Sequence, residues 1–273
     1  MGGGYGGSLV AKELDATADV VLVDPREAFV NAAGSLRALT RPDWAVNVFF
    51  PFDTLLERGR VVRDRVVSAD PAGVTPASGA RLDADYLVLA TGSGYAYPAK
   101  PHPASESIAA ALAPLTARAT LAVTERLNVA GYDHVYALGD LTDLPDPKMA
   151  SYAQVHAQVV AANIAAQLAG RTPETVSTPS PDRRILLPLG PHGGAGQLPA
   201  PSGVTAVPAA TVSERKGLDL FTARFAARFD RSWRFPRPGF VPRQRGPLSF
   251  LPLGRGRCQG NRSLVALMRG RHP

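Results

Sequence analysis

The glycine run at the start of the chain most constrains the fold. Residues 2–7 read Gly-Gly-Gly-Tyr-Gly-Gly, which contains the G-x-G-x-x-G spacing of dinucleotide-binding turns. In such a turn Gly2 allows the tight bend, Gly4 lets backbone amides approach a pyrophosphate, and Gly7 admits close packing of the next helix. Residues 8–14 suit the first turns of that helix, with its amino end toward the pyrophosphate. The sequence therefore predicts an α/β fold with a Rossmann-like domain.

A strand and an acid follow at the expected distance. Residues 20–23, Val-Val-Leu-Val, predict a buried parallel strand because the run is unbroken and mostly β-branched. Asp24 lies 24 − 4 = 20 residues beyond Gly4, the offset at which a carboxylate accepts a hydrogen bond from an adenosine ribose. An ordinary turn residue is the alternative for Asp24. Only Met1 precedes Gly2, so we expect an incomplete first strand and unpaired edges on its neighbours.

Two further strands end in loops suited to the same ligand. Residues 85–90 predict a strand that leads into Thr91 and Gly92, although an ordinary strand-to-loop turn explains that pair equally well. Residues 135–138 predict another strand, which ends at Gly139 and Asp140. Asp140 can accept hydrogen bonds from ribityl hydroxyls or reach the pyrophosphate through water. Together with residues 2–7, these loops predict an FAD site.

Other segments add to the parallel sheet. Residues 61–90 predict a small antiparallel excursion, in which residues 61–62 pair with 66–67. Residues 150–168 predict an alanine-rich helix whose first amides face the pyrimidine carbonyl of the flavin. Met149 is a candidate to line the isoalloxazine, with plain packing at a helix start as the alternative. We expect His156, inside this helix, to have a core or surface role rather than a catalytic one.

The positive charge is confined to the end of the chain. The net charge is +7, yet residues 231–273 hold ten arginines, no lysine and no acid, so residues 1–230 carry 20 − 23 = −3. Prolines throughout the same segment disfavour a packed domain, and we expect a disordered basic tail. Such a tail could bind RNA or anionic lipid. A foreign or out-of-frame segment would have the same composition.

Cysteine usage and apolar runs limit the class of protein. Cys258 is the only cysteine, which excludes an internal disulfide and the paired-thiol relay of some flavin enzymes. No apolar run of about eighteen residues occurs, and no basic leader precedes an apolar stretch. We therefore expect a cytoplasmic protein, with peripheral membrane contact left open.

The motifs resemble, in the same order, those of apoptosis-inducing-factor-like and ferroptosis-suppressor-like flavoproteins, relatives of type II NADH:quinone oxidoreductases. The likeness extends nearly to Asp230. It implies an FAD-dependent enzyme that takes hydride from NAD(P)H and passes electrons to a quinone-like acceptor. The segments that carry the resemblance are residues 2–7, 31–37, 90–93, 129–140, 147–150, 156–164 and 216–221.

The resemblance also implies roles for individual residues. Arg37 and Val62 would flank the adenine-side half of FAD, and Asp140 would hold its ribityl side. Lys216 matches a lysine that lies near the flavin and is the catalytic candidate, with a solvated surface lysine as the alternative. The residues that would hold the pyrophosphate are Gly3, Gly4, Tyr5, Gly6 and Gly7.

One interval departs from the family. The family inserts a second domain, with its own glycine motif, between its Ala-Thr-Gly and Gly-Asp loops. Residues 94–134 occupy that interval here, whereas a nucleotide-binding domain needs about a hundred residues or more. We expect a remnant with a helix (104–117) and a strand (120–123), so NAD(P)H activity is doubtful. The predicted domains are an FAD domain (1–170), a C-terminal region (171–230) and the tail (231–273).

Two other interpretations remain at the level of sequence. The first is a nucleic-acid or anionic-membrane binder that acts through the basic tail on a vestigial flavin fold, with nucleic acid the less favoured partner. The second is a chain that does not fold stably, because its first strand and inserted domain are incomplete.

Overall fold

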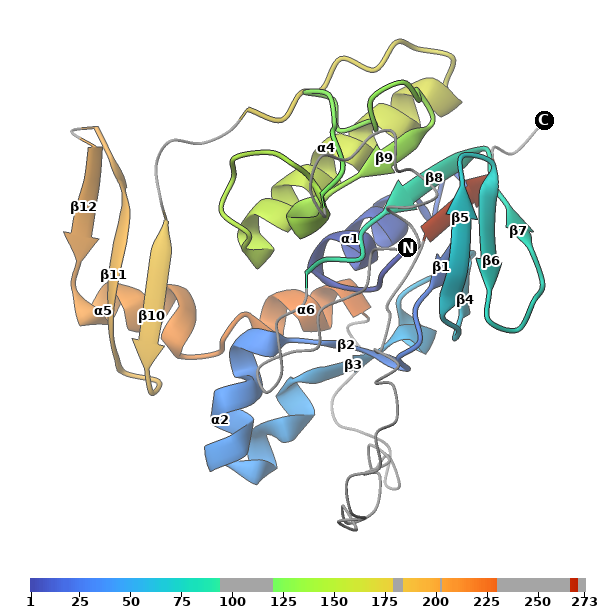
Figure 1. Ribbon diagram of the computed structural model, residues 1–273. Helices are drawn as coiled ribbons and strands as arrows, with labels where there is room; N and C mark the ends of the chain where they lie inside the picture. Colours follow the sequence, from blue (N-terminus) through green and yellow to red (C-terminus); the bar gives the residue numbers. More distant parts are fainter. Residues whose placement is uncertain (94–119, 179–183, 202, 230–265, 270–273) are drawn as a thin grey trace, which may run out of the picture.

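The computed structural model describes residues 1–93, 120–178, 184–201 and 203–229, and the backbone of 266–269. Its centre is a five-stranded sheet in the order β4 (Arg60–Val62), β1 (Asp19–Val23), β13 (Ala266–Arg269), β8 (Tyr86–Leu89) and β9 (Val135–Ala137) (Figure 1). β1 pairs with β4 in parallel, as β8 does with β9, whereas β13 runs antiparallel to both β1 and β8. The strands predicted from residues 20–23, 85–90 and 135–138 are thereby confirmed.

β13 corrects three expectations. The tail was expected to be disordered throughout, yet four of its residues form the middle strand of the sheet, and residues 231–265 and 270–273 lie outside the described part. The sheet is mixed rather than parallel because this strand enters from the opposite end. The facing edges of β1 and β8 are paired rather than open, since β13 bonds to both. Buried backbone groups need partners, and an extended segment from anywhere in the chain can supply them.

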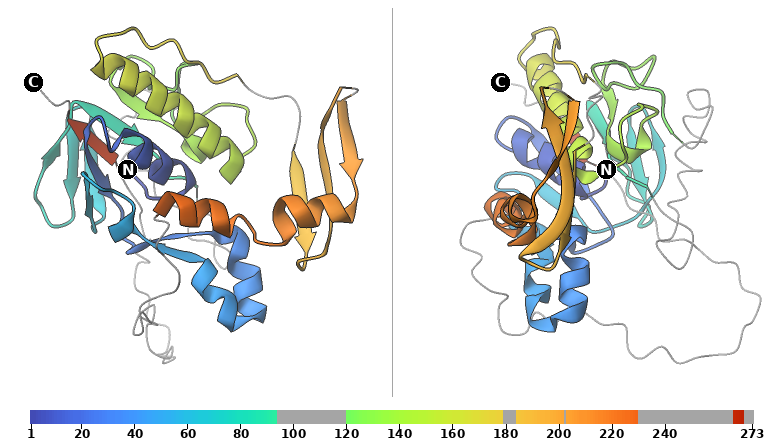
Figure 2. Two further views of the ribbon diagram at one scale, coloured as in Figure 1. Left: turned by 180° about the vertical axis from the view of Figure 1, so that it is seen from behind. Right: turned by 90° about the vertical axis from the view of Figure 1, so that its left-hand side faces the viewer.

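Side chains alternate between the two faces of the sheet, so each face has its own buried core. Val20 and Leu22 of β1 belong to the core beneath the helices α1 (Tyr5–Leu14) and α4 (Ala150–Leu168). Leu87 of β8 belongs to the core on the opposite face. The two helices lie together on one side of the sheet (Figures 1 and 2). Both helices occur where the sequence predicts them, with α1 beginning at the glycine run itself.

A second sheet covers the other face. It is antiparallel and consists of β5 (Val66–Asp70), β6 (Gly73–Pro76) and β7 (Leu82–Asp83). This confirms the antiparallel excursion. The predicted pairing of residues 61–62 with 66–67 is wrong, because residues 61–62 belong to β4 and extend the parallel pair with β1.

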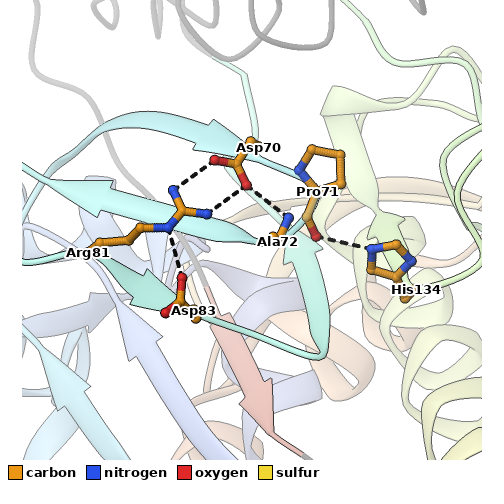
Figure 3. Close-up of polar contacts among 6 residues, drawn as sticks. All are labelled: Asp70, Pro71, Ala72, Arg81, Asp83 and His134. Atoms are coloured by element: carbon orange, nitrogen blue, oxygen red, sulfur yellow. Dashed lines mark hydrogen bonds and ion pairs between the residues drawn. The ribbon is translucent and has the colours of Figure 1, made fainter.

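Ion pairs of Arg81 join strands β5 and β7 of this second sheet. Arg81 donates to both carboxylate oxygens of Asp70, at 2.7 and 2.8 Å, and to Asp83 at 2.8 Å (Figure 3). A ring nitrogen of His134 lies 3.1 Å from the carbonyl oxygen of Pro71 (Figure 3). His134 directly precedes β9, so this contact ties the second sheet to the central one.

The C-terminal region has a sheet of its own. β10 (Ile185–Leu189), β11 (Gly193–Ala200) and β12 (Gly203–Val207) are antiparallel and stand to one side of the central sheet (Figure 2). α5 (Ala209–Val212) and the π-helix η6 (Ser213–Gly217) lead back to α6 (Thr222–Phe229).

Aromatic packing fixes α6 to the rest of the molecule. Phe225 and Phe229 of α6 are buried, with ring centroids 4.9 and 5.3 Å from that of Phe29. Tyr5 at the start of α1 lies edge-on to the same ring at 5.0 Å. The end of the C-terminal region is therefore packed directly beside the helix that follows the glycine turn.

Short elements complete the described part. They are β2 (Ala28–Val30), η1 (Ala32–Gly34), α2 (Ser35–Thr40), η2 (Pro42–Asn47), β3 (Phe49–Pro51), η3 (Phe52–Thr54) and η5 (Gly139–Leu141). No strand forms over residues 120–123, where only isolated bridges link Leu121 to Thr142 and Val123 to Val129, and the helix expected at 104–117 lies outside the described residues. Among the described helices, none is long and apolar enough to cross a membrane.

Candidate functional site

The glycine turn is held between the ends of β1 and β8. The amino group of Met1 donates to Val88 O at 2.7 Å, and Ala90 N donates to Met1 O at 2.7 Å. On the other side, Gly2 N donates to Val23 O at 3.3 Å. The turn therefore lies at the carboxyl edge of both strands, the edge at which open α/β sheets bind ligands.

Close approach of backbone explains why this turn needs glycine. Gly2 has a φ of +90°, and a Cβ there would lie 2.3 Å from Ala90 O. A Cβ on Gly7 would lie 1.8 Å from Gly2 O, so α1 can pack against the turn only without a side chain at that position. Gly4 differs from both, because a Cβ there would meet no atom within 4 Å. Open space thus lies beside Gly4.

The amino end of α1 has the electrostatics of an anion site. The helix begins at Tyr5, after Gly4 as N-cap, and has neither a side-chain cap nor an acid in its first turn. The first amides of an α-helix have no acceptor within the helix and carry the positive end of its dipole. Gly6 and Gly7 are buried in this first turn, and the Tyr5 ring packs away from it among aromatic residues. Gly4 and Tyr5 are half-buried, so their backbone is the part of this turn that remains accessible to a pyrophosphate.

Asp24 lies beside the turn, but both oxygens of its carboxylate already accept hydrogen bonds from the protein. Asp24 is 0% exposed and accepts from Gly3 N at 2.8 Å. Arg26 donates to both of its oxygens, through the backbone N at 2.8 Å, Nε at 2.9 Å and Nη2 at 2.8 Å. Burial alone would lower the pKa of Arg26, but its hydrogen bonds and charge pairing with Asp24 raise it. Asp24 can accept from a ribose only after the Arg26 side chain moves away.

Space for that movement exists. The Arg26 side chain is 41% exposed, and it borders a cavity of about 300 Å³ that is also lined by Phe52 and Arg63. Val62 lies at the same end of the sheet, where its carbonyl accepts from Asp24 N at 3.2 Å. The predicted adenine-side residues Asp24 and Val62 are therefore neighbours.

The loops after β8 and β9 meet directly. Ser93 Oγ donates to Asp140 Oδ2, and Leu138 N donates to Leu89 O at 3.1 Å. Within the described part of the chain, Thr91 Oγ1 is buried without a hydrogen-bond partner. An unpaired buried hydroxyl is costly, so Thr91 is suited to a polar group of a ligand. The predicted pairs Thr91–Gly92 and Gly139–Asp140 are thus brought together with the glycine turn on one edge of the sheet.

A buried histidine supports the Gly139 turn. Gly139 has a φ of +68°, and its N–H donates to His156 Nδ1 at 3.1 Å. His156 Nε2 lies 3.1 Å from Asp146 Oδ2, and both side chains are almost fully buried. Because Nδ1 accepts, the ring proton of neutral His156 is on Nε2 and is donated to Asp146. Burial lowers the pKa of His156, with Asp146 opposing that effect, so the ring is neutral when it holds the turn.

The start of α4 adds a lysine and an exposed methionine. Lys148 Nζ donates to Thr142 O at 2.8 Å, and burial lowers its pKa while Asp140 opposes the shift. Met149 is the N-cap of α4 and is 37% exposed, next to Lys148 and without a side-chain cap. Its role in lining a flavin stays a prediction.

Lys216 and Arg37 belong to a different part of the molecule. Lys216 Nζ donates to Leu186 O of β10 at 2.8 Å, and burial lowers its pKa. Arg37 donates to Leu218 O at 2.9 Å and to Gly217 O. Within the described part of the chain, the hydrogen bonds and cation–π contacts of both side chains run to segments other than the glycine turn. Their proposed places beside the flavin and the adenine half stay predictions.

Two contributors to the site, Arg26 and Arg228, were missed in the sequence, and the bond of Ser93 to Asp140 was not foreseen although Ser93 lies in the predicted segment 90–93. Arg26 occupies the carboxylate of Asp24, and Arg228 of α6 donates to Tyr5 O at 3.1 Å and to Ser8 Oγ at 3.2 Å. Burial lowers the pKa of Arg228 to about 10. Arg26 follows Asp24 by two residues and Ser93 follows Gly92, so proximity to the motifs was the available signal. Arg228 had none, because Tyr5 and Ser8 are more than two hundred residues away in sequence and its third partner, Gln154, is 74 residues away.

Known proteins match a limited part of the chain. No protein-family model matches it. Apoptosis-inducing factor homolog B of Dictyostelium discoideum is 38% identical over 100 residues, which make up 37% of this chain and 26% of that protein. Ferroptosis suppressor protein 1 of Homo sapiens is 38% identical over 84 residues, 31% of this chain and 22% of that protein. The chain thus spans about a quarter of the length of these relatives.

The fold has a solved counterpart. Sulfide:quinone oxidoreductase from the hyperthermophilic bacterium Aquifex aeolicus superposes with a TM-score of 0.63, covering 84% of this chain and 90% of that one at 14% identity. At that identity the likeness concerns the mixed α/β fold. Taken with the matched segments above, it confirms the resemblance inferred from the motifs: over about a third of its length the chain is homologous to apoptosis-inducing factor homologues and ferroptosis suppressor proteins.

Proposed function

We propose that the chain is an FAD-binding oxidoreductase that passes electrons through flavin to a quinone-like acceptor. The observation that carries the proposal is the meeting of the glycine turn, the Thr91 loop and the Gly139–Asp140 loop at one edge of the central sheet. A quinone-like acceptor is proposed because the structural neighbour is named a sulfide:quinone oxidoreductase. NAD(P)H is the co-substrate that the family resemblance implies, but the interval 94–134 is too short for a complete domain to bind it.

The residues present fit FAD. The uncapped first turn of α1 suits a pyrophosphate, and Gly4 leaves open space beside it. Thr91 Oγ1 is a buried hydroxyl in need of a partner, and Asp140 is an acceptor suited to ribityl hydroxyls. Bound FAD would supply the capacity to accept two electrons and release them singly or together. The chain's residues would bind and orient it, with His156 fixing the Gly139 turn.

The catalytic role of Lys216 and the domain limits at residues 170 and 230 are part of this proposal. Lys216 is half-buried and its lowered pKa reflects burial, but its hydrogen bond runs to β10. A cytoplasmic location, with peripheral membrane contact, is proposed with them.

Gly4→Ala tests FAD binding with little change to the fold. Because a Cβ at Gly4 meets nothing within 4 Å and the residue has a φ of −76°, the added methyl strains neither backbone nor packing. The methyl would fill the space proposed for the pyrophosphate. We expect wild-type protein to bind FAD, measured by quenching of flavin fluorescence, and Gly4→Ala to bind at least about tenfold more weakly.

Glu13→Ala is the matched control, because Glu13 lies exposed on the same helix. It should bind FAD as the wild type does. Wild-type protein that neither carries nor takes up FAD would refute the proposed function, and equal affinity of wild type and Gly4→Ala would refute the placement of the pyrophosphate.

A further inference from the structure

A gap between β1 and β8 is filled by two distant parts of the chain. At the end nearest the glycine turn, Met1 bonds to Val88 and Ala90. β13 continues the same line, and Ala266 pairs with Leu22 on one side and with Val88 on the other. The position between β1 and β8 is therefore filled by Met1 and Gly2 at one end and by Ala266–Arg269 along the rest.

The backbone groups of β1 and β8 that face this gap need hydrogen-bond partners. β13 pairs with Asp19–Val23 of β1 in the register Asp19↔Arg269 to Leu22↔Ala266, and with β8 from Tyr86↔Met268 to Val88↔Ala266. The facing strands are central to the sheet, and Leu22 and Val88 are 0% exposed. Backbone N–H and C=O groups buried at such a place are costly unless another extended segment bonds to them.

The sequence of the tail explains which segment enters. Residues 264–268 read Leu-Val-Ala-Leu-Met, the longest apolar run in residues 231–273, and contain no proline or glycine. The rest of that stretch is interrupted by arginine, proline and glycine, which disfavour a central strand. The antiparallel direction also distinguishes β13 from a strand that would lead into Gly2, which would run parallel to β1 and β8.

We propose that the gap between β1 and β8 is a strand-acceptor site whose ligand is the chain's own segment Ala266–Arg269. This strand holds the glycine turn in shape, because Met1 and Gly2 bond to the same two neighbours at the next positions along them. The proposal concerns the sheet alone and does not depend on FAD.

Hydrogen exchange of the full-length chain, followed by mass spectrometry, tests the site. In the wild type we expect the amides of residues 266–269 to exchange at least about tenfold more slowly than those of 255–262. Leu267→Pro removes a strand N–H and should raise exchange in β1, in β8 and at Ala90, whose amide bonds to Met1 O. Gln259→Pro, outside the described strand, is the control and should leave those amides protected.

The wild-type measurement decides the question even where Leu267→Pro fails to fold. Rapid exchange of residues 266–269 in the wild type would overturn the proposal, as would unchanged protection of β1 and β8 in a folded Leu267→Pro protein. Protection that disappears on dilution together with a dimer would show that a second copy supplies the strand, and would overturn the assignment to the chain's own segment.

Discussion

Protonation of His156 should loosen the Gly139 turn, and this makes the stability of the protein depend on pH. In the folded protein Nδ1 accepts the Gly139 N–H at 3.1 Å, and Nε2–H is donated to Asp146. An imidazolium cannot accept at Nδ1, so the buried Gly139 N–H would lose its partner, at a cost of roughly 1–3 kcal/mol. The stronger attraction of an imidazolium to Asp146 opposes this cost.

The direction of the pKa shift decides between these effects. The pKa of His156 is lowered from its ordinary value of 6.5, burial being the largest cause and Asp146, Lys148 and Asp140 the charged groups around it. A group with a lowered folded-state pKa binds its proton more tightly when unfolded. The stabilising contribution of neutral His156 is therefore fully present above about pH 6.5 and is lost as the pH falls below it.

Urea unfolding at several pH values measures this effect. Between about pH 7 and pH 5, the free energy of unfolding of the wild type should fall relative to that of His156→Gln, by up to about 1.4 kcal/mol per pH unit. Glutamine can accept from Gly139 and donate to Asp146 without titrating. The buried amino group of Met1, whose pKa burial also lowers, is common to both proteins and cancels.

Equal pH dependence in the two proteins would refute the role assigned to His156. A wild type that gains stability in acid relative to the variant would show that the Asp146 attraction outweighs the lost Gly139 hydrogen bond.

Three further outcomes are expected. Gly7→Ala should destabilise the protein by about 1–3 kcal/mol or more in urea unfolding, because its Cβ would lie 1.8 Å from Gly2 O; an unchanged midpoint would contradict this packing. Arg26→Ala should lower the unfolding free energy of the FAD-free protein by about 1–3 kcal/mol, and added FAD should recover part of it if ribose hydroxyls take the freed oxygens of Asp24. NADH should reduce bound flavin far more slowly in stopped flow than it does in a full-length relative, because positioning of the donor contributes about 7–11 kcal/mol, whereas dithionite should reduce it readily.

The loops of the proposed FAD edge were predictable because each of them carries a local signal. Glycines at 2, 4 and 7 mark a turn that tolerates no side chain at two of those positions, and Gly139 adopts a positive φ. Val20 to Val23 and the apolar residues of β8 and β9 predict buried strands, and the carboxyl ends of parallel strands meet at one edge. These inferences needed only the residues of a single strand and its following loop.

Interactions between distant segments were not predictable in the same way. Arg228 bonds to Tyr5 and Ser8 through tertiary packing of α6, and the role of His156 depends on Asp146, ten residues earlier, together with a glycine amide. β13 gives only weak signals for a strand, since it is four residues long, has no β-branched residue and belongs to a segment rich in arginine and proline. Its position follows from its pairing with β1 and β8 rather than from its own propensity.

The pairing of β8 with β9 bears on what the interval between them contributes. These strands are direct neighbours, in register from Leu87↔Val135 to Leu89↔Ala137, and the loops beyond them are joined by Ser93 and Asp140. Residues 120–134 support this edge, since Leu121 exchanges backbone hydrogen bonds with Leu141 and Asp143 of the loop after β9. A nucleotide-binding domain for a hydride donor needs about a hundred residues or more, and the interval 94–134 is shorter than that. The proposed FAD site and the expected weak reaction with NAD(P)H are therefore compatible in one chain.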